Sequence, residues 1–558
     1  MSKLIYVYHK NRTDSDEILR NKFLEINNEI VPDNIIPNPP NIYFKSNLCY
    51  AVINPVSTTK CIDDNLLLGL LNNNQEKWHE LNSDRPDGTF VIIRSNNKFI
   101  ETLTDPAGSR SVWYYFDSDK FIISTSQIAI SKYLEDFQLN KKVIPWILSS
   151  GSLGPDNSWD KRVKKIKPNS TLRLDKENWN VTETVDEIKI TSKINDYTKA
   201  SKLLNRELNE LFSNIKYDFS KWYLPLSGGY DSRAILLFLK KYNKEEITTV
   251  TWGTKESKKN PQTDSYIAKK LANKAGVKNL FFVSKKMEKD YDVVLDRFIL
   301  SSEGCIDHIS AYMDGLQLWK DLYNHGCEGI IRGDIPFASV KFNSEIEVRK
   351  TAGLLLCNDF ELLKDYETWG YRKQKIPRNL KRKKNESYQA WIDRLYLQYR
   401  TPVITNSLSD IKYSYVEQST PLLSKNILKI FCEFSDELRE EKTIFKKIVE
   451  EINDDVSFST KSSNEIMELV LRDPAFVDIM KRELTSEQAL LFFPNEFLKN
   501  ILNNLKNYKY IFFKPYKLIY RLKKRFGKNT RLKISYNLIA FRILIILRMQ
   551  RAFDYKNK

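Results

Sequence analysis

Hydrophobic residues in the first third of the chain come in short runs separated by turn-forming polar residues. Thr89–Arg94 is one such run, and Val112–Phe116 and Phe121–Ser124 form a pair around a short polar turn. Lys167–Leu172 has the pattern of a turn that leads into a further strand. Runs of this length, rich in β-branched and aromatic residues, are typical of β-strands. The pattern predicts a mostly β domain over residues 1–190.

The pattern changes near residue 195. Residues 198–215 carry apolar side chains at helical spacing, and a hydrophobic run then ends at a glycine-rich turn before another helical run, Ala234–Leu239. The next β-like run is Ile247–Trp252, and helical spacing resumes after it. A strand, a glycine turn and a helix in this order indicate an α/β domain with a parallel sheet. We expect this domain to span residues 195–490.

Length and composition are those of a globular protein with at least two hydrophobic cores. The chain has 558 residues, of which 41% are hydrophobic and 12% aromatic. Its start has no apolar segment typical of a secretory signal, and the sequence has no uncharged apolar window long enough for a membrane-spanning helix. The six cysteines and four histidines have no zinc-ligand spacing. We therefore expect a reduced, cytoplasmic protein.

The net positive charge belongs to the C-terminal segment. Residues 499–558 hold 17 Lys and Arg against one acid, which accounts for +16 of the formal +18. Residues 508–551 mix these cations with aliphatic and aromatic residues. We expect 491–558 to form a basic amphipathic region that either lies at an anionic membrane surface or packs as a helical cap. Nucleic acid is the weaker alternative, because no nucleic-acid module is recognised.

The most informative stretch is Ser-Gly-Gly-Tyr-Asp-Ser at residues 227–232. The two glycines allow close approach of a ligand to the backbone, and the amides of the following helix offer donors to phosphate. The serines add hydroxyl donors, and Asp231 is placed to hold a magnesium ion. The alternative is an ordinary strand-to-helix turn. The coincidence of strand, loop and helix favours the phosphate interpretation.

This stretch resembles the pyrophosphate loop of ATP-pyrophosphatase enzymes, and residues 85–465 resemble the asparagine-synthetase-like family. The resemblance is carried by Asp87–Phe90, Asp105–Arg110, Ile166–Asn169, the loop, Asp264–Leu271, Glu417–Leu423 and Ser459–Ser462. It implies an α+β, glutaminase-like (Ntn-type) β-rich sandwich followed by an α/β ATP-pyrophosphatase domain (adenine nucleotide alpha hydrolase-like). A helical basic region would complete the chain.

The resemblance implies ATP and Mg²⁺ as cofactors. The nucleotide-binding residues would be Leu226, Ser227, Gly228, Gly229, Asp231, Ser232, Thr251, Gly253 and Gly333. Among these, Leu226, Thr251 and Gly253 would frame the adenosine, and Asp231 would also bind the metal. Lys461 matches a late lysine of the family that would stabilise negative charge in the transition state. A solvated surface lysine is the alternative for that position.

Two departures from the family pattern limit what the resemblance implies. Residue 2 is serine where glutaminase members carry the nucleophilic cysteine, so glutamine hydrolysis is expected to be absent. In the synthetase domain, Asp334 stands for a family glutamate, and Phe337 stands where a second metal-binding acid is usual. We name Asp334 as a catalytic candidate, with Glu303 and Asp307 as further acids near the metal or the substrate amine.

The sequence therefore predicts an ATP-dependent carbon–nitrogen ligase. It would adenylate a carboxylate of an amino acid, peptide or sugar acid and then form an amide with ammonia or a substrate amine. A peptide or β-lactam-type cyclase of the same family is one alternative, and a catalytically degenerate ATP-binding scaffold is another. RNA modification would predict reactive cysteine pairs, which the sequence lacks. The oligomeric state and the substrates stay open.

Overall fold

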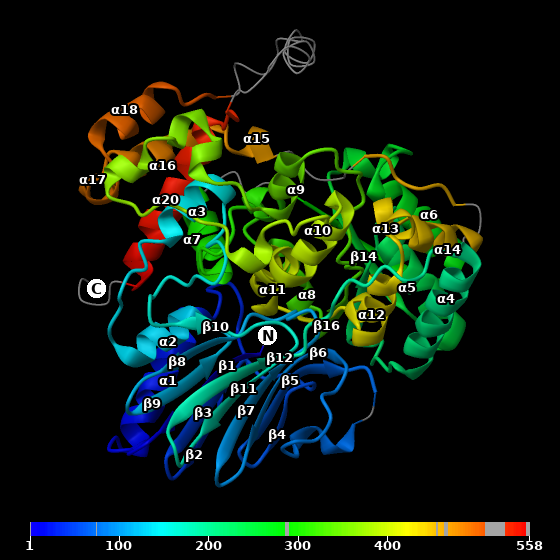
Figure 1. Ribbon diagram of the computed structural model, residues 1–558, viewed down its shortest axis with the longest axis horizontal. Coiled ribbons are helices and arrows are strands. Elements are labelled where there is room, and N and C mark those ends of the chain that lie inside the picture. Colours follow the sequence, from blue (N-terminus) through cyan, green and yellow to red (C-terminus); the bar gives the residue numbers. More distant parts are fainter. Residues whose placement is uncertain are drawn as a thin grey trace.

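The computed structural model describes residues 2–73, 75–284, 290–452, 456–461, 467–507 and 531–553. A β-rich part at the N-terminal end lies beneath a larger part that combines a parallel sheet with many helices (Figure 1). Among the helices of these ranges, none has the length and apolar character needed to cross a membrane.

Two six-stranded antiparallel sheets build the N-terminal part. The first has the order β10 (Lys164–Lys165), β8 (Trp113–Phe116), β9 (Lys120–Ser124), β1 (Lys3–His9), β3 (Leu48–Ile53) and β2 (Asn41–Lys45). The second has the order β12 (Asn180–Val185), β11 (Ser170–Asp175), β7 (Phe99–Thr104), β6 (Gly88–Ser95), β5 (Asn65–Leu71) and β4 (Lys60–Ile62). The predicted strands at 89–94, 112–116 and 121–124 are confirmed as β6, β8 and β9.

The side chains between the two sheets alternate along each strand, as expected where only one face of a strand meets the partner sheet. Leu4 and Tyr6 of β1 share one hydrophobic cluster with Val91 and Ile93 of β6. Their neighbours on β1 point the other way, into the core beneath α1 (Asp16–Ile30) and α2 (Gln127–Leu134). The sheets therefore form a sandwich with helices over one outer face.

A five-stranded parallel sheet builds the larger part, in the order β15-β14-β13-β16-β17. Its strands are β13 (Trp222–Pro225), β14 (Thr248–Gly253), β15 (Lys278–Val283), β16 (Gly329–Ile331) and β17 (Glu417–Ser419). Chain order runs outward from β13 in one direction and then resumes on its other side with β16. The carboxyl ends of β13 and β16 therefore flank a topological switch point, where open α/β sheets bind ligands.

Helices cover both faces of this sheet, as is usual for parallel sheets. Leu224 and Ile331 pack with α4 (Tyr197–Asn214), α5 (Tyr230–Tyr242), α6 (Asp264–Ala275) and α14 (Thr443–Glu451). Val250 and Ile330 belong to the opposite cluster, with α7 (Tyr291–Ser302), α8 (Gln317–Asn324) and α11 (Asn406–Tyr413). The predicted helices at 198–215 and 234–239 are confirmed within α4 and α5.

The last described helix, α20 (Tyr536–Phe553), packs into the protein rather than facing outward (Figure 1). It lies against α3 (Val143–Ser150), α7 and α16 (Pro474–Leu484), with α17 (Glu487–Phe492) and α18 (Asn495–Asn503) close by. Residues 536–553 thus form a packed helical cap, and contact of the basic segment with a membrane surface stays a prediction. Residues 508–530 of the basic segment lie outside the described residues.

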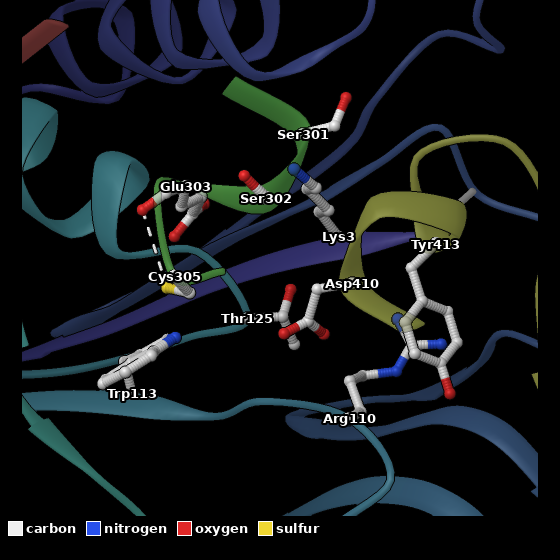
Figure 2. Close-up of a pocket in the computed structure, with 10 residues that line it drawn as sticks. All are labelled: Lys3, Arg110, Trp113, Thr125, Ser301, Ser302, Glu303, Cys305, Asp410 and Tyr413. Carbon is white, nitrogen blue, oxygen red and sulfur yellow. Dashed lines mark hydrogen bonds between the residues drawn. The ribbon is translucent and has the colours of Figure 1, made fainter. Parts of the chain in front are cut away.

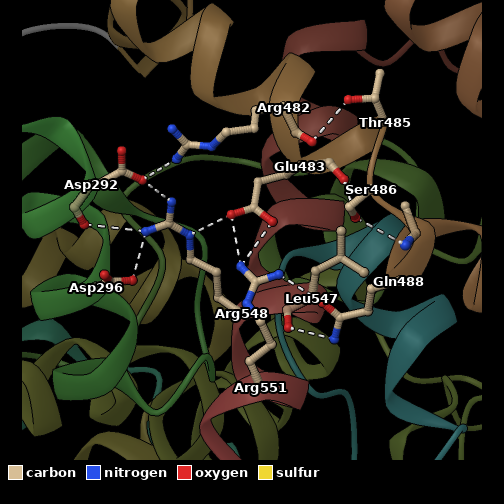
Figure 3. A network of polar contacts seen from close by, with 11 residues as sticks. Asp292, Asp296, Arg482, Glu483, Thr485, Ser486, Gln488, Leu547, Arg548 and Arg551 are labelled. Atoms are coloured by element: carbon tan, nitrogen blue, oxygen red, sulfur yellow. Dashed lines mark hydrogen bonds and ion pairs between the residues drawn. The ribbon is translucent and has the colours of Figure 1, made fainter. Parts of the chain in front are cut away.

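The arginines of α20 are neutralised inside the fold. Arg548 donates to Glu483 at 3.0 Å and to Asp296 at 2.7 Å, and it also bonds to Asp292 (Figure 3). Arg542 donates to Asp307 at 2.7 Å. Since a buried charge is tolerated only when paired, these contacts explain how a basic helix can enter a core.

Candidate functional site

The residues Ser227 to Ser232 link the end of β13 to the start of α5. The Oγ atoms of Ser227 and Ser232 lie 3.0 Å apart, and the Gly229 amide donates to Ser227 Oγ at 3.2 Å. Gly229 is the cap residue, so the first amides of α5 open toward the loop. A cavity of about 330 Å³ lies beside them, lined by loop residues and by Gly333, Ser339, Lys442 and Lys446. The loop chemistry predicted from sequence is therefore presented to an open space.

Gly228 and Gly333 occupy positions where other backbone approaches closely. A β-carbon on Gly228 would lie 2.5 Å from the β-carbon of Ser459, and one on Gly333 would lie 2.7 Å from the Ser232 amide nitrogen. The Gly228 amide also donates to Asp264 Oδ1 at 3.1 Å. Glycine is needed at both positions because any side chain would push apart the segments that surround the loop.

Arg233, which the sequence analysis did not single out, fixes the segment at 456–459 to the loop. Its side chain is fully buried, and Nη2 donates to the Ser457 carbonyl at 2.8 Å, while Nη1 donates to the Val456 carbonyl. The guanidinium lies 3.8 Å from the ring centre of Phe458. Burial lowers the pKa of Arg233 to about 10, so it still carries its charge at neutral pH. In the sequence, the position of Arg233 directly after Ser232 is the one sign of this structural role.

Two lysines from the start of α14 bring positive charge to the cavity. Lys442 Nζ lies 2.7 Å from Asp231 Oδ2, and Lys446 lines the same cavity with its ammonium 5.6 Å from the ring of Tyr230. Lys442 has a left-handed backbone conformation, with φ of +61°. No local pattern marks these residues in the sequence, because they reach the loop through the tertiary fold.

The carboxylates available for a magnesium ion are already paired with cations. Asp231 is bound by Lys442, and Asp334 accepts from Arg332 Nε at 3.0 Å. Burial raises the pKa of Asp231, and Lys442 opposes this shift. Phe337 is buried in the core, 4.7 Å from Phe431 between ring centres.

The possible metal ligands among the described residues are also dispersed rather than clustered. Within the described ranges, no group of three or more His, Cys, Asp or Glu side chains is placed to hold a metal ion. A magnesium ion on nucleotide phosphates uses only one or two protein carboxylates, and Asp231 is the acid that lines the cavity at the loop. The assignment of Asp231 as its ligand stays a prediction that the Lys442 ion pair weighs against.

The residues expected near adenosine lie together at the carboxyl ends of β13 and β14. Thr251 Oγ1 donates to the Leu226 carbonyl at 2.8 Å, and the Leu226 amide donates to Val250 at 2.8 Å. Gly253 ends β14. Leu226 directly precedes the phosphate loop, and Thr251 and Gly253 lie on the neighbouring strand, an arrangement that suits a nucleoside attached to the bound phosphates. Their contact with adenosine stays a prediction.

Lys461 is held near the loop by its backbone. Its amide donates to Gln262 at 3.0 Å, its carbonyl accepts from Asp264 at 3.2 Å, and it pairs with Thr263 in a parallel bridge. Its side chain is exposed, and residues 462–466 lie outside the described residues. The backbone of Lys461 therefore lies close to the loop, and the catalytic role of its side chain stays a prediction.

Glu303 and Asp307, expected near the metal, face other parts of the molecule. Glu303 accepts from Ser126 and from the Gln127 amide at 2.7 Å, and it lines a small interdomain pocket with Lys3 (Figure 2). Asp307 accepts a hydrogen bond from Arg542 Nε of α20. The segment that follows α7 thus engages the β-sandwich through Glu303 and α20 through Asp307, and the role of both acids toward a metal or a substrate amine stays a prediction.

The two parts of the molecule meet through a buried ion pair. Arg110 bonds to Glu417, and these side chains are only 3% and 1% exposed. Glu417 also accepts from the Ser2 amide at 3.1 Å, and the Ser2 hydroxyl lies 2.8 Å from Thr59 Oγ1. Ser2 is buried, so its hydroxyl is tied into the interface. This arrangement joins Ser2 and the β-sandwich to the start of β17.

Comparison with known proteins gives one family match. Residues 224–301, which contain the loop, α5 and β14, match the model of the family described as asparagine synthase. No curated protein sequence matches. Among solved structures, the chain is similar to the allosteric regulatory enzyme of purine biosynthesis and to a glutamine phosphoribosylpyrophosphate amidotransferase from B. subtilis complexed with ADP and GMP.

Each of the two structures is 9% identical to the chain at a TM-score of 0.21. The matches cover 51% of this chain and 80% and 81% of those chains. A similarity at this level carries no structural conclusion, so the architecture stands on the strand order given above.

Proposed function

We propose that the protein is an ATP-dependent ligase that adenylates a carboxylate and then forms an amide. The observation that carries this proposal is the glycine loop of residues 227–232, which opens onto a lysine-lined cavity at the switch point of a parallel sheet. The asparagine synthase match over 224–301 supports an ATP-dependent amidation chemistry in general.

The first step would transfer the adenylyl group. A carboxylate oxygen attacks the α-phosphorus of ATP, the bond to the β-phosphate oxygen breaks, and pyrophosphate leaves as the acyl-adenylate forms. The amides at the start of α5, the hydroxyls of Ser227 and Ser232, and the ammonium groups of Lys442 and Lys446 would hold the leaving pyrophosphate. Fixed donors of this kind stabilise charge as it develops on the leaving group.

The second step would form the amide. An amine attacks the activated carbonyl carbon, the carbon–nitrogen bond forms, AMP leaves with the electron pair of the broken carbon–oxygen bond, and the amine loses its extra proton. The nitrogen would come from ammonia or from an amine on the substrate, because Ser2 is a buried serine within the domain interface. A substrate that carries both groups would be cyclised by the same chemistry.

A second candidate is an ATP-binding scaffold without catalysis. Specific observations favour it: Asp334 is neutralised by Arg332, and Phe337 is committed to the core. A chain that keeps the loop and loses its acidic partners could still bind nucleotide without turning it over.

The exchange of labelled pyrophosphate into ATP distinguishes the two candidates. Purified full-length protein is tested with amino acids, peptides and uronic acids, with Asp231→Ala as the control variant. The ligase predicts exchange that depends on one acid and disappears in the variant. ATP binding without exchange for any acid would favour the scaffold, and a failure to bind ATP would refute both.

A further inference from the structure

A polar cluster lies at the carboxyl end of β16, on the other side of the switch point from the loop. Arg332 Nη1 donates to Ser409 Oγ at 2.6 Å and to Gln418 Oε1 at 2.9 Å, and Nη2 donates to Asp334 at 3.1 Å. The Gln418 side-chain amide donates to the Ser409 carbonyl at 2.8 Å. Arg332 is therefore fixed in position by α11 and by the end of β17.

Lys412 follows Ser409 by one helical turn of α11, so the two project from the same face of the helix. Its ammonium lies 5.7 Å from the ring centre of Trp319. Burial and the nearby charge of Arg332 hold the pKa of Lys412 well below its usual range, and Asp334 acts in the opposite direction. Within the ranges that the structure describes, no group forms a hydrogen bond or ion pair with this ammonium.

The cluster therefore has more positive than negative charge. Arg332 and Lys412 face the single carboxylate of Asp334, and Asp334 already bonds to Arg332. Lys412 is half-buried, and no carboxylate bonds to its ammonium. Desolvation of an unpaired charge is unfavourable for folding, so its presence needs a reason other than stability. A bound anion would neutralise it.

The position of the cluster indicates which anion. Asp334 lies close enough to act electrostatically on both Lys412 and Asp231, so the cluster adjoins the loop. Gly333, the residue before Asp334, touches the first turn of α5. Trp319 stacks edge-on against Trp252 at the end of β14, at 5.7 Å between ring centres. An acid bound here would lie next to a nucleotide whose phosphates occupy the loop.

We propose that Lys412, together with Arg332, binds a carboxylate group of the acid substrate and thereby selects acids for adenylation. This inference rests on the proposed function and deepens it. A phosphate group of ATP is the other anion with the same chemistry, and the experiment below distinguishes the two. Lys412 is a binding residue here, and Arg332 provides a second cation whose position is already fixed.

The test compares the wild type with Lys412→Met, Lys412→Arg and the exposed-lysine control Lys240→Met. For the acid found by pyrophosphate exchange, KM for the acid is expected to rise about 10- to 100-fold in Lys412→Met, as for the loss of a charged hydrogen bond. KM for ATP should stay within about twofold by the same reasoning. Lys412→Arg should recover part of the loss, and Lys240→Met should behave as the wild type.

Thermal unfolding provides a readout that does not need activity. Methionine keeps the length of the side chain and removes a half-buried charge that no carboxylate pairs with, so Tm of Lys412→Met should equal or exceed that of the wild type. A clear fall in Tm would make Lys412 a structural residue and overturn the inference. An unchanged KM for the acid would overturn it as well, and so would a rise confined to KM for ATP. A wild type without any exchange would instead refute the proposed function.

Discussion

The ammonium nitrogen of Lys442 lies 2.7 Å from the Oδ2 atom of Asp231, although 211 residues separate them along the chain. Asp231 lies in the first turn of α5, and Lys442 is the residue before α14. The contact places a cation beside the carboxylate that the sequence suggested for a metal. It also places that cation where phosphate oxygens would lie above the first turn of α5.

Replacing Lys442 is therefore expected to weaken nucleotide binding. Lys442→Met should raise Kd for ATP about 10- to 100-fold, since a charged hydrogen bond to phosphate is lost. Lys447→Met is the matched control, because Lys447 lies on the same helix and is exposed. Calorimetric titration with ATP measures both variants. Equal affinities for the two would show that Lys442 does not contact the nucleotide.

Phe337 is expected to stabilise the hydrophobic core and not to take part in metal binding. Phe337→Ala should lower the free energy of unfolding by about 3–5 kcal/mol, the usual cost of emptying an aromatic core position. Phe337→Asp should be at least as damaging, because it places an unpaired carboxylate in the core. Urea unfolding measures both effects. A stable Phe337→Asp protein that gains affinity for Mg²⁺ would contradict this prediction.

The buried Arg110–Glu417 pair should show strong coupling between the two parts of the molecule. Arg110→Met leaves Glu417 buried and unpaired, which should cost about 3–5 kcal/mol of unfolding free energy. The double variant Arg110→Met/Glu417→Met should be less destabilised than the single variant, because no unpaired charge remains. Lys77→Met, which removes an exposed pair with Glu80, serves as the reference for a surface contact. Additive effects of the two interface changes would argue against the ion pair.

Acid should weaken the docking of α20. Burial alone would raise the pKa of Asp307, but Arg542 and His308 lower it to about 2. A carboxylate whose pKa is lower in the folded state stabilises the fold above its unfolded pKa of about 3.9, and this stability is lost as the pH falls toward 2. The difference in unfolding free energy between wild type and Asp307→Asn should therefore narrow by about 1 kcal/mol between pH 6 and pH 3. A difference that stays constant with pH would mean that the pair does not exist in solution.

The sequence by itself determined the local features. Alternation of apolar residues located β6, β8 and β9, and helical spacing located α4 and α5, because these periods reflect which face of each element is buried. The loop at residues 227–232 was also predictable, since glycine, serine and a following helix are all local requirements for binding phosphate.

Tertiary structure alone decided which distant residues share the site. Lys442, Lys446 and Lys412 have no local signal, because each reaches the switch point through the packing of helices that are far from the loop in sequence. The same packing joined Glu303 to Ser126 and Gln127, and Asp307 to Arg542. It also buried α20, whose composition alone suited either a membrane surface or a core, since carboxylates from α7, from α16 and from the segment after α7 neutralise Arg542 and Arg548.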